Sequence, residues 1–153
     1  MRIVIQRVIN SFVKVDGKLI SSINRGLNLL VGFSKSDYPS ISSDFSKIID
    51  KILNLRIFED DKGKMNLSLI DVDGEVLLVS QFTLYGNIFS GRRPSFDKAL
   101  EYDRAKELFL KLQEEFSKRW NKVKVGEFGA HMEVGIFNDG PVTFILDWEV
   151  KNP

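Results

Sequence analysis

The residues that could do chemistry gather in two short stretches, far apart in the chain. The first is Ser80-Gln81-Phe82-Thr83, where two hydroxyls and an amide follow the apolar run 76–79. The end of a rigid, buried strand is a good platform for a site. Backbone N–H groups near Phe82 and Thr83 could face the oxyanion that develops in acyl transfer. The alternative is a polar strand end that only caps its own backbone.

The second stretch is Asn138-Asp139-Gly140-Pro141-Val142-Thr143, between the strand-like runs 132–137 and 142–148. Glycine tolerates backbone angles that other residues avoid, and proline fixes its own φ and removes a donor. Such a turn can hold backbone carbonyls rigidly outward. Its ordinary interpretation is a β-turn with a trans proline, because only about 5–6% of X-Pro bonds in folded proteins are cis.

The sequence does not favour conventional nucleophilic catalysis. Thr83 or Ser80 would need a general base, and the chain has one histidine, His131, to which we give no catalytic role. There is no nucleophile elbow, zinc-protease motif, phosphate-binding loop or dinucleotide fingerprint. The absence of cysteine excludes disulfides and thiolate catalysis. We therefore expect an enzyme here to use positioning and backbone electrostatics, with no metal and no cofactor, and with help from its substrate.

Hydrophobic periodicity predicts the elements that position these stretches. Strands are expected over residues 2–9, 13–15 and 19–20 (around an Asp16-Gly17 turn), 27–33, 55–58, 66–70, 75–82, 123–126, 132–137 and 142–148. The acidic segments 60–63 and 71–74 read as hairpin turns, because they lack the spacing of a calcium loop. One helix should follow Pro39, and a longer one should span 97–120. This order predicts a single α+β domain over 1–153, with mainly antiparallel, barrel-like or layered sheets and two main helices packed on a sheet.

Charge gives a weaker indication of the partner. The formal net charge is +1, so no global field attracts nucleic acid, but residues 86–124 carry ten Lys or Arg against six Asp or Glu. A solvated helix face explains this excess about as well as a phosphate track does. The candidate phosphate contacts are Arg92, Arg93, Lys122 and Lys124. We expect no membrane span and no signal peptide, and we expect a cytoplasmic protein.

Taken together, the two polar stretches resemble the D-aminoacyl-tRNA deacylase family. The resemblance continues through Ile5-Gln6-Arg7-Val8, the segment 51–60, Gly63-Lys64-Met65-Asn66 and Gly91-Arg92-Arg93-Pro94-Ser95-Phe96, and it covers nearly all of residues 1–148. Two motifs in order, with matching stretches between them, form a far more specific signal than either motif alone.

The resemblance implies a homodimer in which a Gly140-cis-Pro141 turn of one subunit enters the active site of the other. There its carbonyls hold the α-amino group of the substrate and leave no room for an L side chain. Ser80, Gln81, Phe82 and Thr83 line the receiving pocket, and we also assign Asn138 and Met132 to substrate binding. The expected reaction is hydrolysis of the ester in D-aminoacyl-tRNA, assisted by the 2′-hydroxyl of the terminal adenosine. Glycyl-tRNA is expected to be accepted, because glycine has no side chain to exclude.

Two alternatives to this function stay open. One is a non-catalytic nucleic-acid-binding module on the same fold, against which the intact Thr83 and Gly140-Pro141 argue. The other keeps the chemistry but takes mischarged glycyl- or L-alanyl-tRNA. The loop 86–90 departs from the more basic stretch that is usual in the family. Its Ile88 and Phe89 could stack on a base or pack at a dimer interface, and we favour packing.

Overall fold

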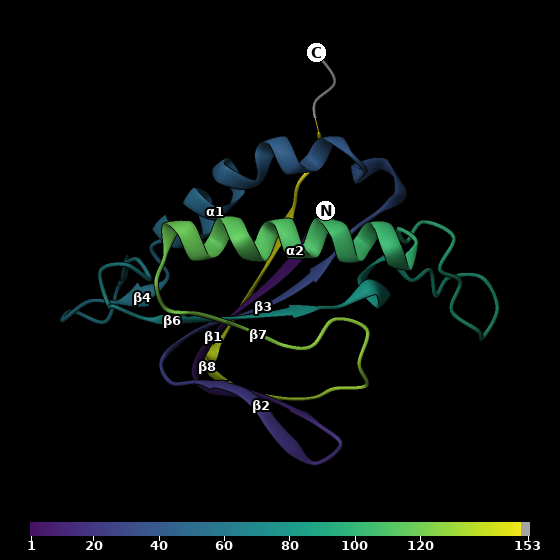
Figure 1. Ribbon diagram of the computed structural model, residues 1–153. Coiled ribbons are helices and arrows are strands. Elements are labelled where there is room, and N and C mark those ends of the chain that lie inside the picture. Colours follow the sequence, from purple (N-terminus) through teal and green to yellow (C-terminus); the bar gives the residue numbers. More distant parts are fainter. Residues whose placement is uncertain (151–153) are drawn as a thin grey trace.

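The computed structural model describes residues 1–150, so the last three residues of the expected domain range lie outside it. A six-stranded sheet forms the centre of the molecule (Figure 1). Its strand order is β2-β1-β3-β6-β7. The sixth strand, β8, lies outside this path and pairs with β1 along residues 2–14. The strands are β1 (Arg2–Val15), β2 (Lys18–Ile23), β3 (Gly26–Gly32), β6 (Glu75–Ser80), β7 (Val123–Val125) and β8 (Glu133–Asp147). A separate hairpin joins β4 (Phe58–Glu59) to β5 (Met65–Leu67).

The sheet contains both antiparallel and parallel strand pairs, and the two main helices lie in the connections between the parallel strands. β1 runs antiparallel to β2, β3 and β8, whereas β3–β6 and β6–β7 are parallel pairs. Parallel neighbours need a long crossover connection. The chain supplies two, one with α1 (Phe45–Asn54) and one with α2 (Tyr102–Arg119). The predicted α+β class, with two main helices packed on a sheet, is confirmed.

The main core lies between the sheet and the two helices. Alternate residues of β1, Ile3 and Ile5, are buried against it, as a strand with two different faces requires. The helices contribute the apolar stripes that the sequence predicts; the fully buried members are Ile48, Ile49, Ile52, Leu108, Leu112 and Phe116. Each such side chain contributes about 1.5–3 kcal/mol by leaving water. No helix within residues 1–150 is long and apolar enough to cross a membrane.

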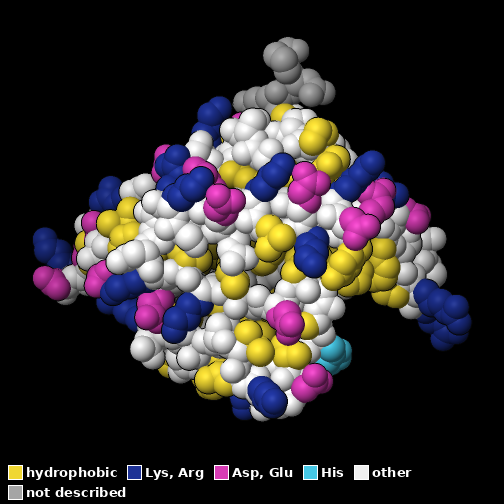
Figure 2. Space-filling model, in the orientation of Figure 1, with side chains coloured by type: hydrophobic (Ala, Val, Ile, Leu, Met, Phe, Trp, Pro, Cys, Tyr) yellow, Lys and Arg dark blue, Asp and Glu magenta, His cyan; other side chains and the backbone are white. Residues whose placement is uncertain are grey.

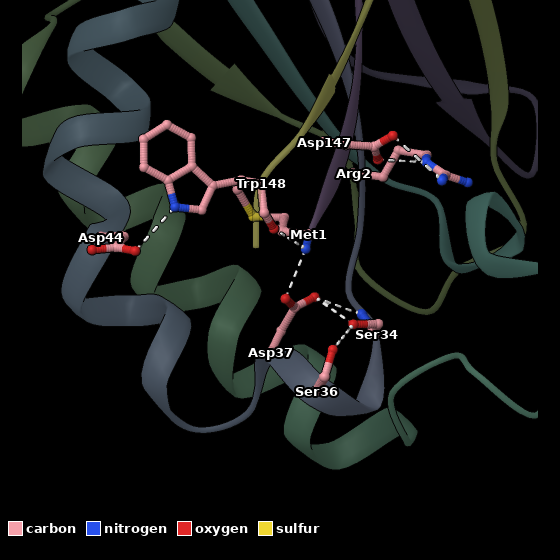
Figure 3. A network of polar contacts seen from close by, with 8 residues as sticks. All are labelled: Met1, Arg2, Ser34, Ser36, Asp37, Asp44, Asp147 and Trp148. Atoms are coloured by element: carbon pink, nitrogen blue, oxygen red, sulfur yellow. Dashed lines mark hydrogen bonds and ion pairs between the residues drawn. The ribbon is translucent and has the colours of Figure 1, made fainter. Parts of the chain in front are cut away.

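Polar contacts around Met1 tie the start of β1 to the end of β8 (Figure 3). The buried ammonium of Met1 donates to Asp37 Oδ1 at 2.7 Å and to the carbonyl of Trp148 at 2.8 Å. The Asp37 carboxylate also accepts hydrogen bonds from the N–H and the hydroxyl of Ser34, the N-cap of the short helix η1 (Lys35–Asp37). Arg2 pairs with Asp147 at 2.7 Å. These contacts fix the strand ends on which the neighbouring loops are built.

Several predicted boundaries are wrong, and tertiary pairing gives the reason. The long helix begins at Tyr102 rather than at residue 97, because the segment before it pairs with residues 33–35, just after β3. There Lys35 N–H donates to the Lys98 carbonyl and Leu100 N–H to the Phe33 carbonyl, both at 3.0 Å. The hairpin expected around 60–63 exists as β4–β5, shifted from 55–58 and 66–70. The segment 71–74 turns, but β5 and β6 do not form a hairpin.

The largest correction concerns residues 138–143, which do not reverse the chain. Both halves of β8 pair with β1 in the same direction, with Thr143 opposite Gln6 and Asn138 opposite Val8. Four residues of β8, 139–142, therefore lie opposite Arg7 alone. The motif is an enlarged β-bulge inside one long strand, and bulges of this kind re-aim the chain without ending the sheet. The Gly140–Pro141 bond is cis, as the resemblance implies.

Candidate active site

A cavity of about 530 Å³ opens between the end of β6, the start of α2 and the segment before β8. Its walls are mainly apolar. The lining residues from the predicted site are Ser80, Gln81, Phe82 and Met132, and those from elsewhere include Phe33, Leu100, Tyr102, Phe128, Gly129, Ala130, His131 and Val134. An apolar cleft with a few convergent polar groups is the usual form of a small-ligand site.

The polar wall is built where β6 ends and the short helix η3 (Phe82–Tyr85) begins. Gln81 N–H donates to the Val31 carbonyl at 2.7 Å, which continues the pairing of the buried strands by one residue. The Thr83 hydroxyl then donates to Gln81 Oε1 at 2.6 Å. Thr83 is not among the lining residues, but its hydroxyl contacts Gln81, which is one of them. Phe82 and Thr83 are the first two residues of η3, where backbone N–H groups have no partner within the helix.

Two features hold η3 in place against the sheet. A Cβ at Gly32 would lie 2.8 Å from the Gln81 carbonyl oxygen and 3.1 Å from Leu84 Cβ, so a glycine is required for this close approach. Arg2 reaches over from β1 and donates to the Leu84 carbonyl at 2.9 Å. Its guanidinium also stacks on the Tyr85 ring, 5.2 Å from the centroid. The platform is therefore fixed from both sides.

Tyr85 faces the Met1 side of the molecule, away from the cavity. It lines a second hollow of about 490 Å³ together with Met1, Arg2 and Asp37. Burial, reinforced by the Asp37 carboxylate, raises the pKa of Tyr85 to about 12, although Arg2 opposes the shift. The phenol is thus a neutral structural group under ordinary conditions.

The opposite wall was not predicted, because its residues come from segments that look ordinary in the sequence. Phe128 contacts the rings of Tyr102 and Phe109 at centroid distances of 5.3 and 5.6 Å. Gly129 adopts a φ of +78° directly beside the Tyr102 side chain, leaving no room for a Cβ. Gly129 itself was the sequence signal for this tight approach.

The charges of the site are few. Among the lining residues of this cavity there is no carboxylate, lysine or arginine, and His131 and Tyr102 are the titratable side chains. The site therefore offers hydroxyl, amide and backbone groups rather than a charged acid–base pair. Any proton transfer beyond these groups has to involve His131, water or the substrate itself.

Arg7 holds the β8 bulge from inside the protein, a role that sequence reasoning missed. Its side chain is 5% exposed, and it donates to the carbonyls of Asp139 at 3.1 Å and Ile57 at 2.9 Å. Asn138 closes the base of the bulge: its Oδ1 accepts from Val142 N–H and its Nδ2 donates to Thr143 Oγ1, both at 2.8 Å. The exposed tip formed by Gly140 and Pro141 is thus anchored at both ends.

The structure does not bring that tip to the cavity of its own chain. Val134 lines the cavity, and Asn138 lies four residues further along an extended strand, about 13 Å away. The proposed RNA contacts are also dispersed. Arg92 and Arg93 are exposed on the loop after η3, whereas Lys122 pairs with Asp73 at 2.6 Å and Lys124 donates to the Ser22 carbonyl.

Comparison with known proteins identifies the family. Residues 4–147 match the family model described as D-Tyr-tRNA(Tyr) deacylase. The chain belongs to that family. It is 54% identical over 147 residues to the D-aminoacyl-tRNA deacylase of Aquifex aeolicus, covering 96% of this chain and 97% of that one. It is 56% identical over 144 residues to the protein of the same name from Persephonella marina, covering 94% and 95%.

Solved structures share the fold of this chain. A protein described as c-Myc DNA Unwinding Element Binding Protein is 39% identical, with a TM-score of 0.89 over 98% of this chain and 100% of that one. A probable eukaryotic D-amino acid tRNA deacylase shares the fold at 18% identity, with a TM-score of 0.82 over 96% and 98%. The family, the fold class and the enzyme class predicted from the sequence, a hydrolase of the aminoacyl-tRNA ester, are confirmed.

Proposed function

We propose that this protein hydrolyses the ester between a D-amino acid and the 3′ end of tRNA. The observation that carries the proposal is the fixed Ser80–Thr83 platform at the wall of an apolar cavity, in a chain of the D-Tyr-tRNA(Tyr) deacylase family. In the reaction, water oxygen bonds to the ester carbonyl carbon, the bond from that carbon to the ribose oxygen breaks, and a proton passes to the ribose oxygen. The products are a free D-amino acid and tRNA.

The platform would bind the negative charge that develops on the carbonyl oxygen. The N–H groups of Phe82 and Thr83 would supply preorganised donors, and a single such donor is worth about 10²–10³-fold in rate. The Gln81 amide, held by the Thr83 hydroxyl at 2.6 Å, would orient the ester. Since the cavity lining offers no charged base, we propose that the 2′-hydroxyl of the terminal adenosine assists the attack.

Selection between mirror images is assigned to the bulge of a second subunit. In this proposal the carbonyls around Gly140 and Pro141 enter the cavity of the partner and hold the α-amino group of the substrate. A flexible apolar pocket discriminates by only about 1–3 kcal/mol per methylene. Backbone anchored by Arg7 and Asn138 is a firmer wall. Glycine has no side chain for this wall to exclude, so glycyl-tRNA should also be hydrolysed.

The free edge of β8 supports a homodimer. Within residues 1–150, β8 pairs with β1 alone, which leaves one side of a 15-residue strand unpaired. Phe137, Phe144 and Ile145 on this strand are 52%, 43% and 66% exposed. A long, apolar edge promotes association unless another element covers it. A second copy of the chain would cover that edge and carry the bulge to a neighbouring cavity.

The first experiment compares release of D-Tyr and L-Tyr from charged tRNA. The proposal expects rapid release of D-Tyr and none of L-Tyr above the uncatalysed rate. Equal release of both would remove the stereochemical part of the proposal and leave an unselective esterase. Replacing the terminal adenosine by 2′-deoxyadenosine should slow hydrolysis strongly, and an unchanged rate would exclude assistance by the 2′-hydroxyl.

A second experiment tests whether each site uses two subunits. One variant carries Thr83→Val and the other Gly140→Ala, whose new Cβ would lie 2.7 Å from Val142 Cγ2. After denaturation and refolding together, half of the dimers should be mixed, and each should contain one intact composite site. About a quarter of the selective wild-type activity should therefore return. No recovery, with mixed dimers present by mass spectrometry, would show that the two motifs do not form one site across subunits.

The alternative of a nucleic-acid-binding module is favoured by one observation, the name of the solved protein at 39% identity. Binding of tRNA or DNA without hydrolysis would support it, and turnover would reject it. Arg92, Arg93, Lys122 and Lys124 remain our proposed RNA contacts, and a cytoplasmic location remains part of the proposal. Of these four, the two arginines are the more accessible, because both lysines make contacts within the chain.

A further inference from the structure

The loop after η3 forms a narrow arm that projects from the rim of the cavity. Asn87 and Ser95 pair through two backbone hydrogen bonds, of 2.7 and 2.9 Å, and close residues 88–94 into a tip. We name residues 88–94 the arm. One residue beyond its base, Phe96 packs on Phe82 with the ring centroids 5.1 Å apart. Because Phe82 lines the cavity, the base of the arm is fixed to the cavity wall.

The tip of the arm combines exposed apolar surface with positive charge. Phe89 is 97% exposed and Ile88 is 71% exposed, so neither packs on its own chain. Arg92 and Arg93 follow, the arm contains no Asp or Glu, and neither arginine forms an ion pair with any residue in the range 1–150. In Figure 1 this loop lies between η3 and α2 at the right. In Figure 2 the outermost side chains there are Lys or Arg, with apolar side chains behind them.

In place of the interface packing favoured from the sequence, we propose that the arm binds the unpaired 3′ end of the tRNA, with a base stacked on the Phe89 ring and phosphates held by Arg92 and Arg93. The inference rests on the proposed function and extends it to the nucleotides beyond the scissile ester. An exposed aromatic ring beside cations without acidic neighbours is the pattern of single-strand binding, where bases stack and the backbone is neutralised. The two arginines would repel a second basic arm but attract a polyanion.

The length of the arm suits this partner. A tip of seven residues can extend at most three to four residues from its base, or about 10 Å. Stacked nucleotides rise about 3.4 Å each along one strand. The arm could therefore follow up to about three nucleotides beyond the terminal adenosine, and these together with that adenosine make up the unpaired 3′ end of a tRNA.

The test uses full-length protein and two ligands, D-tyrosyl-tRNA and its truncated form, 3′-O-D-tyrosyl-adenosine. Phe89→Ala should raise KM for D-tyrosyl-tRNA about 5- to 100-fold with kcat unchanged. It should leave hydrolysis of the adenosine ester as in wild type. Phe89→Tyr should behave like wild type, and Phe89→Leu, which keeps the apolar surface but loses the π face, like Phe89→Ala. Arg92→Gln should lower the slope of the logarithm of the tRNA binding constant against the logarithm of salt concentration by about one. Lys62→Gln, the same charge change in the β4–β5 turn, should leave that slope unchanged.

Other outcomes overturn the inference. Wild-type behaviour of Phe89→Leu would indicate plain apolar contact, and unchanged KM in Phe89→Ala would exclude any role in substrate binding. A shift towards monomer in sedimentation of Phe89→Ala would assign the arm to the subunit interface. Dissociation constants for deacylated tRNA, measured by fluorescence anisotropy, keep the arm testable even if wild type hydrolyses neither ester. In that case the proposed function fails, and the arm is judged by binding alone.

Discussion

Replacing Arg7 should both destabilise the protein and loosen the bulge that carries Gly140 and Pro141. In Arg7→Met the side chain keeps most of its length but loses its donors. The Ile57 carbonyl is left without its buried partner, and the Asp139 carbonyl loses the bond that anchors the bulge. A hydrogen bond to a charged group is worth about 1.5–3 kcal/mol.

The carboxylates near Arg7 add little to the stability that Arg7→Met is expected to lose. Asp139 and Glu59 lie 3.4 and 3.7 Å from the guanidinium, but their side chains are 45% and 56% exposed and can turn to water. Counting the two carbonyl bonds near the lower end of their range gives about 3 kcal/mol. For a chain of 153 residues this corresponds to a fall in Tm of about 6–12 °C. Arg7→Lys should lose about half as much, because an ammonium cannot span both carbonyls as the guanidinium fork does.

The assay is urea unfolding followed by circular dichroism, with Arg119→Met as the matched control. Arg119 also forms two ion pairs, with Asp50 at 2.9 Å and Glu115 at 3.1 Å, but on the surface of α2. Its loss should cost less than about 1 kcal/mol. Under the proposed function, folded Arg7→Met should also release L-Tyr from tRNA. A free energy of unfolding within about 1 kcal/mol of wild type would refute the assignment of Arg7 as the anchor.

Three further changes have expected outcomes. Asp37→Asn leaves the buried ammonium of Met1 without its counter-ion and should cost about 3–5 kcal/mol in urea unfolding. Thr83→Val removes the donor to Gln81 at similar volume; kcat for D-tyrosyl-tRNA should fall about 10- to 100-fold, with stability nearly unchanged. The folded-state pKa of Tyr85 is raised from 10.0 to about 12. The contribution of the protonated phenol to the free energy of unfolding is therefore complete below pH 10 and is lost as the pH rises towards 12. Tyr85→Phe should flatten the fall in unfolding free energy over that window.

Each of these outcomes has a distinct contradiction. An Asp37→Asn protein as stable as wild type would mean that water or Trp148 satisfies the ammonium. A fall in kcat of Thr83→Val that is accompanied by a large fall in its free energy of unfolding would mark Thr83 as a structural residue of η3. A Tyr85→Phe protein that loses stability between pH 10 and 12 as steeply as wild type would show that other groups cause the alkaline transition.

Parts of the site could be predicted from local sequence because local physics decides them. The apolar run before Ser80 is short and partly β-branched, which favours a buried strand, and the polar residues after it then lie at the strand end. Residues 16–17 turn as the Asp-Gly pair predicts, with φ values of +50° and +76°. The stripes of α1 and α2 likewise face the core for reasons contained in their own spacing.

Arg7 shows a signal that was present but was not used. It shares the inward-facing parity of Ile3 and Ile5 on β1, and a charged residue at such a position needs buried partners. The sequence could not name those partners, because the carbonyls of Ile57 and Asp139 belong to the backbone and lie 50 and 132 residues away. Every residue has a backbone carbonyl, so the residue types at 57 and 139 gave no sign of this role.

The sequence alone determined where most strands and the two main helices lie, though not all of their boundaries, and it identified the two polar motifs. Spacing, turn residues and family resemblance are properties of the sequence itself. Only the tertiary structure decided that residues 139–142 bulge from one continuous strand, that residues 98–100 pair with residues 33–35, and that Tyr102 and Phe128 form the far wall of the cavity. Those outcomes depend on backbone pairing and ring packing between distant segments. Such contacts form only when the sheet and helices have come together, and no local pattern of side chains specifies them.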